Sequence, residues 1–416
     1  MELKQIRNKF KDLNGVQESI QKLENRPVKI QWKGIHGGAK AFTSAAVAKE
    51  VPGHHLFILQ DKEEAAYFLN DLQHIFPDDE RVVFYPASYK VPYKLEKTDN
   101  ANVVGRAEAL DHITKASNMW IVTYPKALFE QLPTQKKLAS NSFKVEKGRE
   151  YDIEFLNEFL MDQDFQIVDF VYEPGQFAIR GGIVDVFSYS NDLPFRLEFF
   201  GDELETIRSF DPVSQLSEKT CEFFHIVPDI QHSLEQTENG SFLSFIGASS
   251  TIWMSSYKEV KSQLETEYTK AVKIYSDLPD SAVEHHSPNE LFYHPTEWEK
   301  EVDLLSQIEW GPDYTHKDTT EINFGNQPQP SFNKNFDLLT ADLKQRKKQG
   351  YTNLIFSNQP KQIERLHDIF RDIKASVDFT SINASIHEGF ISDELKLVCY
   401  TDHQIFERYQ DRKSVV

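Results

Sequence analysis

Two glycines and one lysine, Gly34, Gly37 and Lys40, follow a predicted strand in a pattern close to that of a phosphate-binding loop. In such a loop, glycines let backbone N–H groups surround the phosphates, and a Ser or Thr after the lysine holds Mg²⁺. Here Ala39 stands where the second glycine is required, and Ala41 stands where the hydroxyl is required. We therefore expect this degenerate nucleotide loop not to hydrolyse ATP. Weak binding of an anion at the following helix stays open.

A second group of chemically informative residues lies between positions 173 and 211, where short predicted strands are separated by turns. In the strand 195–200, side chains alternate with period two, so the odd-numbered apolar residues share one face. Arg196 and Phe200 lie on the other face, and Arg180 ends an earlier strand. Arginine beside an exposed aromatic residue is typical of a partner surface. The alternative is an ordinary strand face with solvated arginines.

Other constellations do not indicate catalysis or metal binding. The pair His54–His55 stands at the start of a predicted strand, where local packing is the simpler interpretation. The pair His285–His286 lies in a polar loop without the helical spacing of a zinc site. Cys221 and Cys399 are the two cysteines and lie far apart in sequence, so we expect no disulfide framework, no cysteine-based metal site and no cofactor.

Composition sets the class of protein. The chain has 416 residues, 39% hydrophobic and 27% charged, which is typical of a globular protein of two to four domains. It has no run of eighteen apolar residues and no apolar stretch at its start, so we expect a cytoplasmic protein without a membrane partner. A net charge of −19 argues against nucleic acid as the main partner. The basic run 344–348 fits a solvated helix face.

The elements that must position these residues form an α/β pattern. Short apolar runs predict buried strands, and spacings of three and four predict helices between them. Such alternation implies a largely parallel sheet. The strands are expected near 28–32, 56–59, 82–85 and 120–122, and the helices near 44–49, 61–75 and 103–113.

The chain divides into four predicted segments. Residues 1–142 form the first half of an α/β domain, and 143–217 form a small α+β domain whose helix is capped by Asp152. Residues 218–325 return to mixed α/β signals. Residues 326–416 combine a Gly/Pro/Asn-rich linker with another small α/β unit. The last residues have no terminating pattern, so we expect a piece of a longer protein.

The stretch 173–211 closely resembles the module shared by the excision-repair helicase UvrB and the bacterial transcription-repair coupling factors (Mfd). The resemblance implies that 143–217 is inserted into the α/β domain and binds UvrA. UvrB has an intact phosphate loop and a long aromatic hairpin after its third strand. This chain has only the short segment 85–96, with Tyr85, Tyr89 and Tyr93, so the coupling factors match better.

The resemblance also implies roles for single residues. Arg180 and Arg196 would contact acidic or carbonyl groups on UvrA, and Phe200 would fill a pocket beside them. The chain would then be a non-catalytic platform that recruits UvrA to stalled RNA polymerase. In the family, the full-length protein is an ATP-dependent DNA translocase that also binds RNA polymerase and DNA through regions absent here. Its carboxy-terminal domain masks the UvrA surface.

Two alternatives from other classes remain. An active UvrB-type ATPase or helicase subunit would require the intact phosphate loop that Ala39 and Ala41 interrupt. A DNA-binding regulator would show a steep dependence of duplex affinity on salt.

Overall fold

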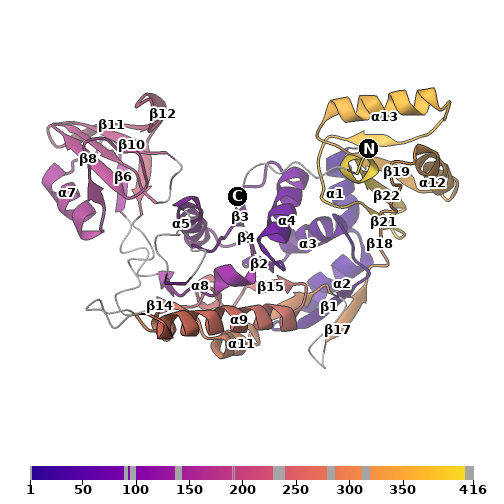
Figure 1. The fold of residues 1–416 in the computed structure, drawn as a ribbon, viewed down its shortest axis with the longest axis horizontal. Helices are drawn as coiled ribbons and strands as arrows, with labels where there is room; N and C mark the ends of the chain where they lie inside the picture. The colour runs from indigo at the N-terminus through magenta and orange to yellow at the C-terminus, as the bar shows by residue number, and fades with distance from the viewer. Residues whose placement is uncertain are drawn as a thin grey trace.

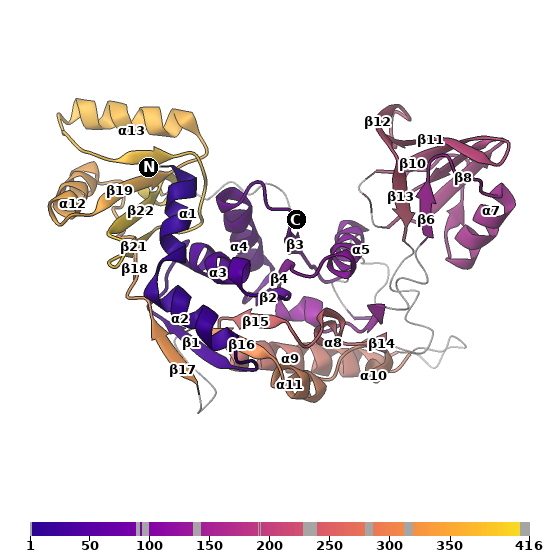
Figure 2. The same cartoon turned by 180° about the vertical axis from the view of Figure 1, so that it is seen from behind.

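The computed structural model describes residues 2–88, 92–93, 100–135, 143–189, 191, 193–227, 239–278, 286–311 and 319–407. The described chain forms a large unit (2–135 with 239–323), an inserted unit (143–227) and a last unit (327–407). The inserted and last units lie at opposite ends of the large unit (Figures 1 and 2). The predicted α/β multidomain class is confirmed. Within the described ranges, no helix is long and apolar enough to cross a membrane.

The large unit is built on a parallel sheet. Its strand order, within the described residues, is β17-β1-β16-β15-β2-β4-β3, and every neighbouring pair is parallel. Strands β2, β15 and β16 are buried along their whole length, as strands covered on both faces must be. The strands are β1 (Lys29–Lys33), β2 (His55–Ile58), β3 (Val82–Phe84), β4 (Trp120–Thr123), β15 (Thr251–Met254), β16 (Ser306–Glu309) and β17 (Thr320–Asn323).

Helices cover this sheet and follow the predicted signals. Asp61 caps α4, accepting from the N–H of Glu64 at 2.8 Å, and the Glu64 carboxylate accepts from the N–H of Gln60. The elements are α1 (Leu3–Lys11), α2 (Asn14–Leu23), α3 (Ala39–Glu50), α4 (Lys62–Ile75), α5 (Asn100–Lys115), η2 (Pro125–Leu128), α8 (Phe242–Ile246), α9 (Tyr257–Ser276), α10 (Pro288–Leu291) and α11 (Pro295–Val302), with a short ladder of β5 (Leu132–Pro133) and β14 (Asn239–Gly240).

One helix begins earlier than predicted. The stretch expected to become helical at Ser44 starts at Ala39, with Gly38 as its N-cap residue. Alanine and lysine are strong helix formers, and nothing after Gly38 interrupts the pattern. Lys40 therefore lies in the first turn of α3 and not in a loop.

The inserted unit has its own core. Its main sheet has the order β12-β11-β10-β9-β8-β7, and β6 pairs with β13. Phe224 and Ile226 of β13 belong to its core, so the predicted boundary at 217 falls inside this unit. Its elements are β6 (Phe143–Glu146), α7 (Ile153–Asp162), β7 (Gln166–Ile167), β8 (Gln176–Arg180), β9 (Ile183–Val186), β10 (Phe195–Phe200), β11 (Glu203–Phe210), β12 (Ser217–Cys221) and β13 (Phe223–Ile226).

The segment predicted as a linker is ordered and largely integrated. Phe324 is buried against Trp32, and Asn326 is also buried. The last unit has a sheet of order β18-β21-β22-β19-β20. Its elements are β18 (Gln327–Pro328), α12 (Phe336–Lys348), β19 (Thr352–Phe356), α13 (Pro360–Asp372), β20 (Thr380–Ile382), β21 (Phe390–Ser392), β22 (Leu397–Thr401) and α14 (Asp402–Ile405).

The last unit shares a core with the large unit. Phe10 of α1 stacks on Phe42 of α3 at 4.8 Å between ring centroids, and Phe390 of β21 lies 5.8 Å from Phe10 and 6.2 Å from Phe42. Phe356 of β19 also contacts Phe42. One face of the last unit's sheet therefore packs on α1 and α3, and α12 and α13 cover its other face. The two units form one packed block.

We expect Phe390→Ala to destabilise the large unit, although Phe390 belongs to the last unit. Loss of this buried ring should lower the free energy of unfolding by about 3–5 kcal/mol. All five tryptophans, Trp32, Trp120, Trp253, Trp298 and Trp310, lie in the large unit, so their fluorescence in a denaturant titration reports on it alone. Leu338→Ala, at an exposed position of α12, is the control and should change stability by less than about 0.5 kcal/mol. An unshifted tryptophan transition in Phe390→Ala would contradict the shared core.

Candidate functional site

The main sheet of the inserted unit has a buried face and an outer face. Phe195 and Leu197 of β10 are buried, and Phe199 packs partly against the same core, so the predicted alternation is confirmed. Arg196 lies opposite Asp185 of β9 in the antiparallel register. The outer face of β8, β9 and β10 therefore brings together side chains that are far apart in sequence.

A β-bulge sets the position of Phe200. The register between β10 and β11 pairs Glu198 with Thr206, but it pairs Phe199 with Leu204, so Glu205 is an extra residue. The bulge keeps Leu204 in the core while Phe200 stays on the outer face, opposite Glu203. The side chain of Phe200 is 76% exposed, far more than any structural role in the sheet requires.

A buried carboxylate holds both predicted arginines. Asp185 is fully buried, and its two oxygens accept from Nε and Nη2 of Arg196 at 2.7 and 2.8 Å. Nη2 of Arg180 donates to the same carboxylate. The Asp185 carboxylate also raises the pKa of Arg196, because it favours the charged guanidinium. The structure therefore brings Arg180 and Arg196 together on one partner.

Each arginine also holds a loop. Nη1 of Arg180 donates to the Asp169 carbonyl at 2.8 Å, and its guanidinium lies 5.2 Å from the ring centroid of Phe170. Arg196 contacts the backbone and side-chain oxygens of Gln215 at 3.5 and 3.4 Å. Gln215 in turn donates to the Val171 carbonyl at 3.3 Å, which links the two loops.

The sequence interpretation missed Asp185. The available signal was an acidic residue inside the apolar run Ile183–Val186, where a carboxylate cannot be buried without cationic partners. A second carboxylate on the same face, Glu198, accepts from Thr206 at 2.8 Å and pairs with Arg208.

Part of the chain, including the inserted unit, is similar to known proteins. Residues 143–232 match a family described as the UvrB interaction domain. The inserted unit thus has the character of a protein-interaction module in DNA repair. The chain is 29% identical over 206 residues to the transcription-repair-coupling factor of Myxococcus xanthus, which covers 48% of this chain and 17% of the relative. It is 25% identical over 195 residues to that of Bacillus subtilis, covering 47% and 16%.

The UvrABC system protein B of Streptococcus uberis is 29% identical over 197 residues, which covers 44% of this chain and 29% of that protein. The matched segment thus spans less than a third of each of these three relatives. The resemblance expected from the sequence, to the module shared by UvrB and the transcription-repair coupling factors, is confirmed.

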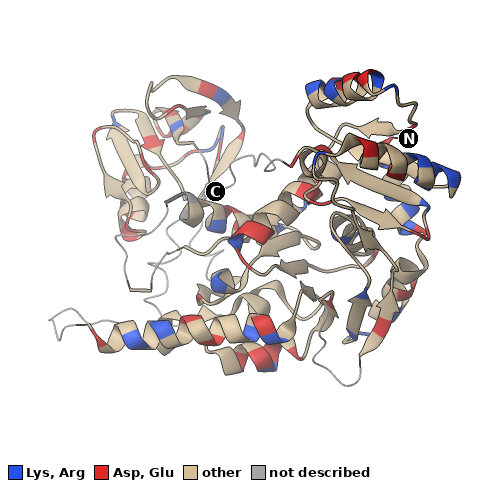
Figure 3. Cartoon of the chain, turned by 45° about the vertical axis from the view of Figure 1, so that its right-hand side comes forward, with Lys and Arg blue, Asp and Glu red and all other residues tan. Residues whose placement is uncertain are grey.

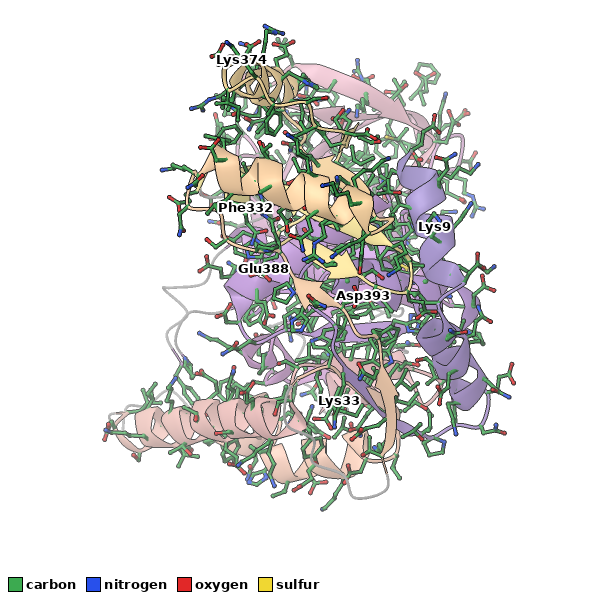
Figure 4. All side chains as sticks on the ribbon, turned by 90° about the vertical axis from the view of Figure 1, so that its right-hand side faces the viewer. Lys9, Lys33, Phe332, Lys374, Glu388 and Asp393 are labelled. Carbon is green, nitrogen blue, oxygen red and sulfur yellow. The ribbon has the colours of Figure 1, made fainter. Side chains whose placement is uncertain are left out.

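The degenerate nucleotide loop is filled from within the chain. Gly34 and Gly37 have φ values of +60° and +52°, which favour glycine. The N–H of Gly38, at the N-terminus of α3, donates to the carbonyl of Glu388 at 2.8 Å. A Cβ at Gly37 would lie 2.7 Å from the carbonyl oxygens of Glu388 and Gly389. The segment 386–389 of the last unit therefore lies against the glycines of this loop. Glu388 is labelled in Figure 4, where it lies below α12.

A small cavity of about 130 Å³ remains beside this contact, lined in part by Lys40 and Asp71. The ring of His387 stacks on Tyr67 of α4 at 3.5 Å between ring centroids, and the backbone N–H of His387 donates to the Asp71 carboxylate at 2.6 Å. Thr43, which follows the loop, is fully buried in α3. Side chains of α4 and the last unit thus line the space next to Lys40.

The remaining predicted groups lie in structural roles. Nε2 of His55 lies 3.0 Å from the Val51 carbonyl, and Trp253 donates to Nδ1 at 3.1 Å, so the packing interpretation is correct for His55. Burial lowers the pKa of His55 to about 4. Tyr85 is buried against Phe242, whereas Tyr89 and His285 lie outside the described residues.

The basic run of α12 is partly neutralised. Lys347 pairs with Asp378 at 2.7 Å, and Arg346 lies 3.5 Å from Asp342. Figure 3 shows acidic and basic residues interspersed along α9 and α13. Neither feature provides the continuous basic face that nucleic acid binding requires.

We expect Asp71→Asn to stabilise the packed block. Burial raises the pKa of Asp71 in the folded state well above its usual value. The folded state therefore loses stability as the pH rises above the pKa that Asp71 has in the unfolded chain. Asparagine keeps the acceptor for His387 without the cost of an ionisable group. Melting curves should show a gain on the order of 1 kcal/mol that is larger at pH 8 than at pH 5. The control is Asp368→Asn on α13, where the carboxylate is exposed, and its effect should not grow with pH. A loss of stability in Asp71→Asn at pH 8 would show that the charged form is required.

Proposed function

We propose that this chain is the UvrA-recruiting, amino-terminal part of a transcription-repair coupling factor, acting in cytoplasmic nucleotide excision repair at stalled RNA polymerase. One observation carries the proposal: the outer face with Arg180, Arg196 and Phe200 lies inside the segment that matches the UvrB interaction domain. A 76% exposed Phe200 beside two arginines has the composition of a binding hot spot.

The proposal includes the absence of catalysis. Ala39 and Ala41 remove the second glycine and the hydroxyl of a phosphate loop. The Glu388 carbonyl also accepts a hydrogen bond from the N–H of Gly38. This N–H is one of the donors at the start of α3 that have no partner within the helix. These contacts argue against a UvrB-type ATPase. The net charge of −19 argues against a DNA-binding regulator.

Calorimetric titration with the cognate UvrA tests the recruiting role. The chain should bind, and Phe200→Ala should weaken binding by roughly 30- to 1000-fold, as expected for loss of about 2–4 kcal/mol at a central anchor. The melting temperature should not change, because this side chain is exposed.

Leu197→Ala is the matched control on the opposite face of the same strand. Leu197 is fully buried, so this variant should lose about 2–5 kcal/mol of stability. Absence of any UvrA binding by the parent chain would reject the recruiting role. Early melting of Phe200→Ala would show instead that this residue supports the fold.

A nucleotide test addresses the inert loop. Mg-ATP should not raise the melting temperature of the parent chain, whereas tight binding would stabilise it by a few kcal/mol. The double variant Ala39→Gly, Ala41→Thr should also fail to respond, because Glu388 still occupies the N–H of Gly38. A shift in the parent that disappears in Lys40→Ala would overturn the inert loop.

A further inference from the structure

The arginines of the outer face have little freedom to contact a partner directly. The side chain of Arg196 is 17% exposed and that of Arg180 is 37% exposed. Their guanidinium groups already bind Asp185, the Asp169 carbonyl and Gln215. A guanidinium engaged in this way must break internal hydrogen bonds to reach an external acceptor, which offsets much of the gain.

The loops beside the arginines carry exposed apolar side chains. The first loop, residues 168–172, carries Phe170 and Tyr172, which are 50% and 54% exposed. The second loop, residues 211–216, carries Val213 and Leu216, which are 85% and 69% exposed. Large apolar side chains at such exposure on two adjacent loops are a feature of interaction sites.

Contacts with the outer face of the sheet fix both loops in place. Val171 packs with Ala178, Phe187 and Phe210 in a small core on the outer face of the sheet. The guanidinium of Arg196 lies 4.6 Å from the ring centroid of Phe210, and Gln215 donates to the carbonyls of Val171 and Pro212. The backbone of both loops is therefore held by the two arginines bound to Asp185 and by this small core.

We propose that the two loops are contact elements for the partner, and that Arg180, Arg196 and Asp185 act chiefly as positioning residues that hold the loops. This inference rests on the proposed function and adds to it. The partner surface it requires on UvrA is apolar where it meets Tyr172 and Val213, in addition to the pocket that accepts Phe200.

Two observations favour UvrA as the occupant over a second copy of this chain. Both loops lie inside the segment that matches the UvrB interaction domain, and they are continuous with the proposed Arg180–Phe200 surface through the shared carboxylate of Asp185. Self-association is an outcome that the test also measures.

The first experiment is titration of UvrA into Tyr172→Ser and Val213→Ser. Each variant should weaken binding at least 10-fold with an unchanged melting temperature. Met161→Ser is the matched control, because Met161 is similarly exposed at 52% but lies on α7, which packs on the buried face of the sheet. Unchanged binding by both loop variants would overturn the inference. A second result would also overturn it: the parent and both loop variants bind UvrA equally, and the parent forms a concentration-dependent dimer that Val213→Ser abolishes. The loops would then be a contact between two copies of this chain.

The second experiment separates positioning from direct contact. Gln215→Ala leaves both arginines and Asp185 intact but removes the link between the loops, so it should weaken UvrA binding about 5- to 10-fold. Asp185→Asn should also weaken binding, whereas direct contact with acidic groups on UvrA predicts tighter binding once the internal carboxylate charge is gone. If Asp185→Asn does not fold, Gln215→Ala alone decides, and unchanged affinity in that variant overturns the positioning role.

The salt dependence of the affinity for UvrA also distinguishes positioning by the arginines from direct contact. Contact through apolar loops predicts a nearly constant affinity for UvrA between 50 and 300 mM NaCl, while exposed charge pairs weaken as salt screens them. A steep loss of affinity with salt would favour direct arginine contacts and reject the positioning role. If the parent chain does not bind UvrA, the proposed function fails. If the parent binds, Phe200→Ala weakens binding and the loop variants do not, only this inference fails.

Discussion

The buried carboxylate of Asp185 is the interaction on which the outer face of the inserted unit depends. A carboxylate excluded from water must be neutralised, and here two guanidinium groups from neighbouring strands neutralise it. Because both arginines are fixed on one acceptor, the loops that they contact are fixed as well. The Asp185–Arg180–Arg196 charge cluster therefore shapes the outer face of this sheet, with the exposed Phe200 at one side and the two loops with their exposed apolar side chains at the other.

A different constraint governs the other end of the molecule. The last unit covers α1 and α3 with one face of its sheet, so the start of α3 is not open to solvent as it would be in a nucleotide-binding enzyme. The segment 386–389 then places a backbone carbonyl at the Gly38 N–H, where a phosphate oxygen would accept in an active loop. Ala39 and Ala41 in the loop and the packing of the last unit thus support the same proposal, that this loop does not bind nucleotide.

The local features were predictable from sequence, and the features that depend on distant contacts were not. Period-two alternation placed Leu197 inside and Arg196 outside, and the cap at Asp61 fixed the start of α4, because both follow from neighbours in the chain. The bulge at Glu205 and the role of Asp185 require the pairing of separate strands. The contact of Glu388 with Gly38 joins residues 350 positions apart, and no periodicity in either segment signals it.

The connection between the units explains how the inserted unit, with its proposed binding surface, is accommodated without interrupting the parallel sheet of the large unit. The chain leaves the large unit after β5 and returns at β14, and these two strands pair directly, with Leu132 opposite Gly240 and Pro133 opposite Asn239. The points where the chain leaves and re-enters the large unit are therefore held side by side. Strands from before and after the insertion can then pair in one parallel sheet. The inserted unit keeps a separate core of its own at one end of the molecule (Figure 2). Among the described residues, the small core on its outer face is separate from the core of the block, so substitutions there are expected to leave the block intact.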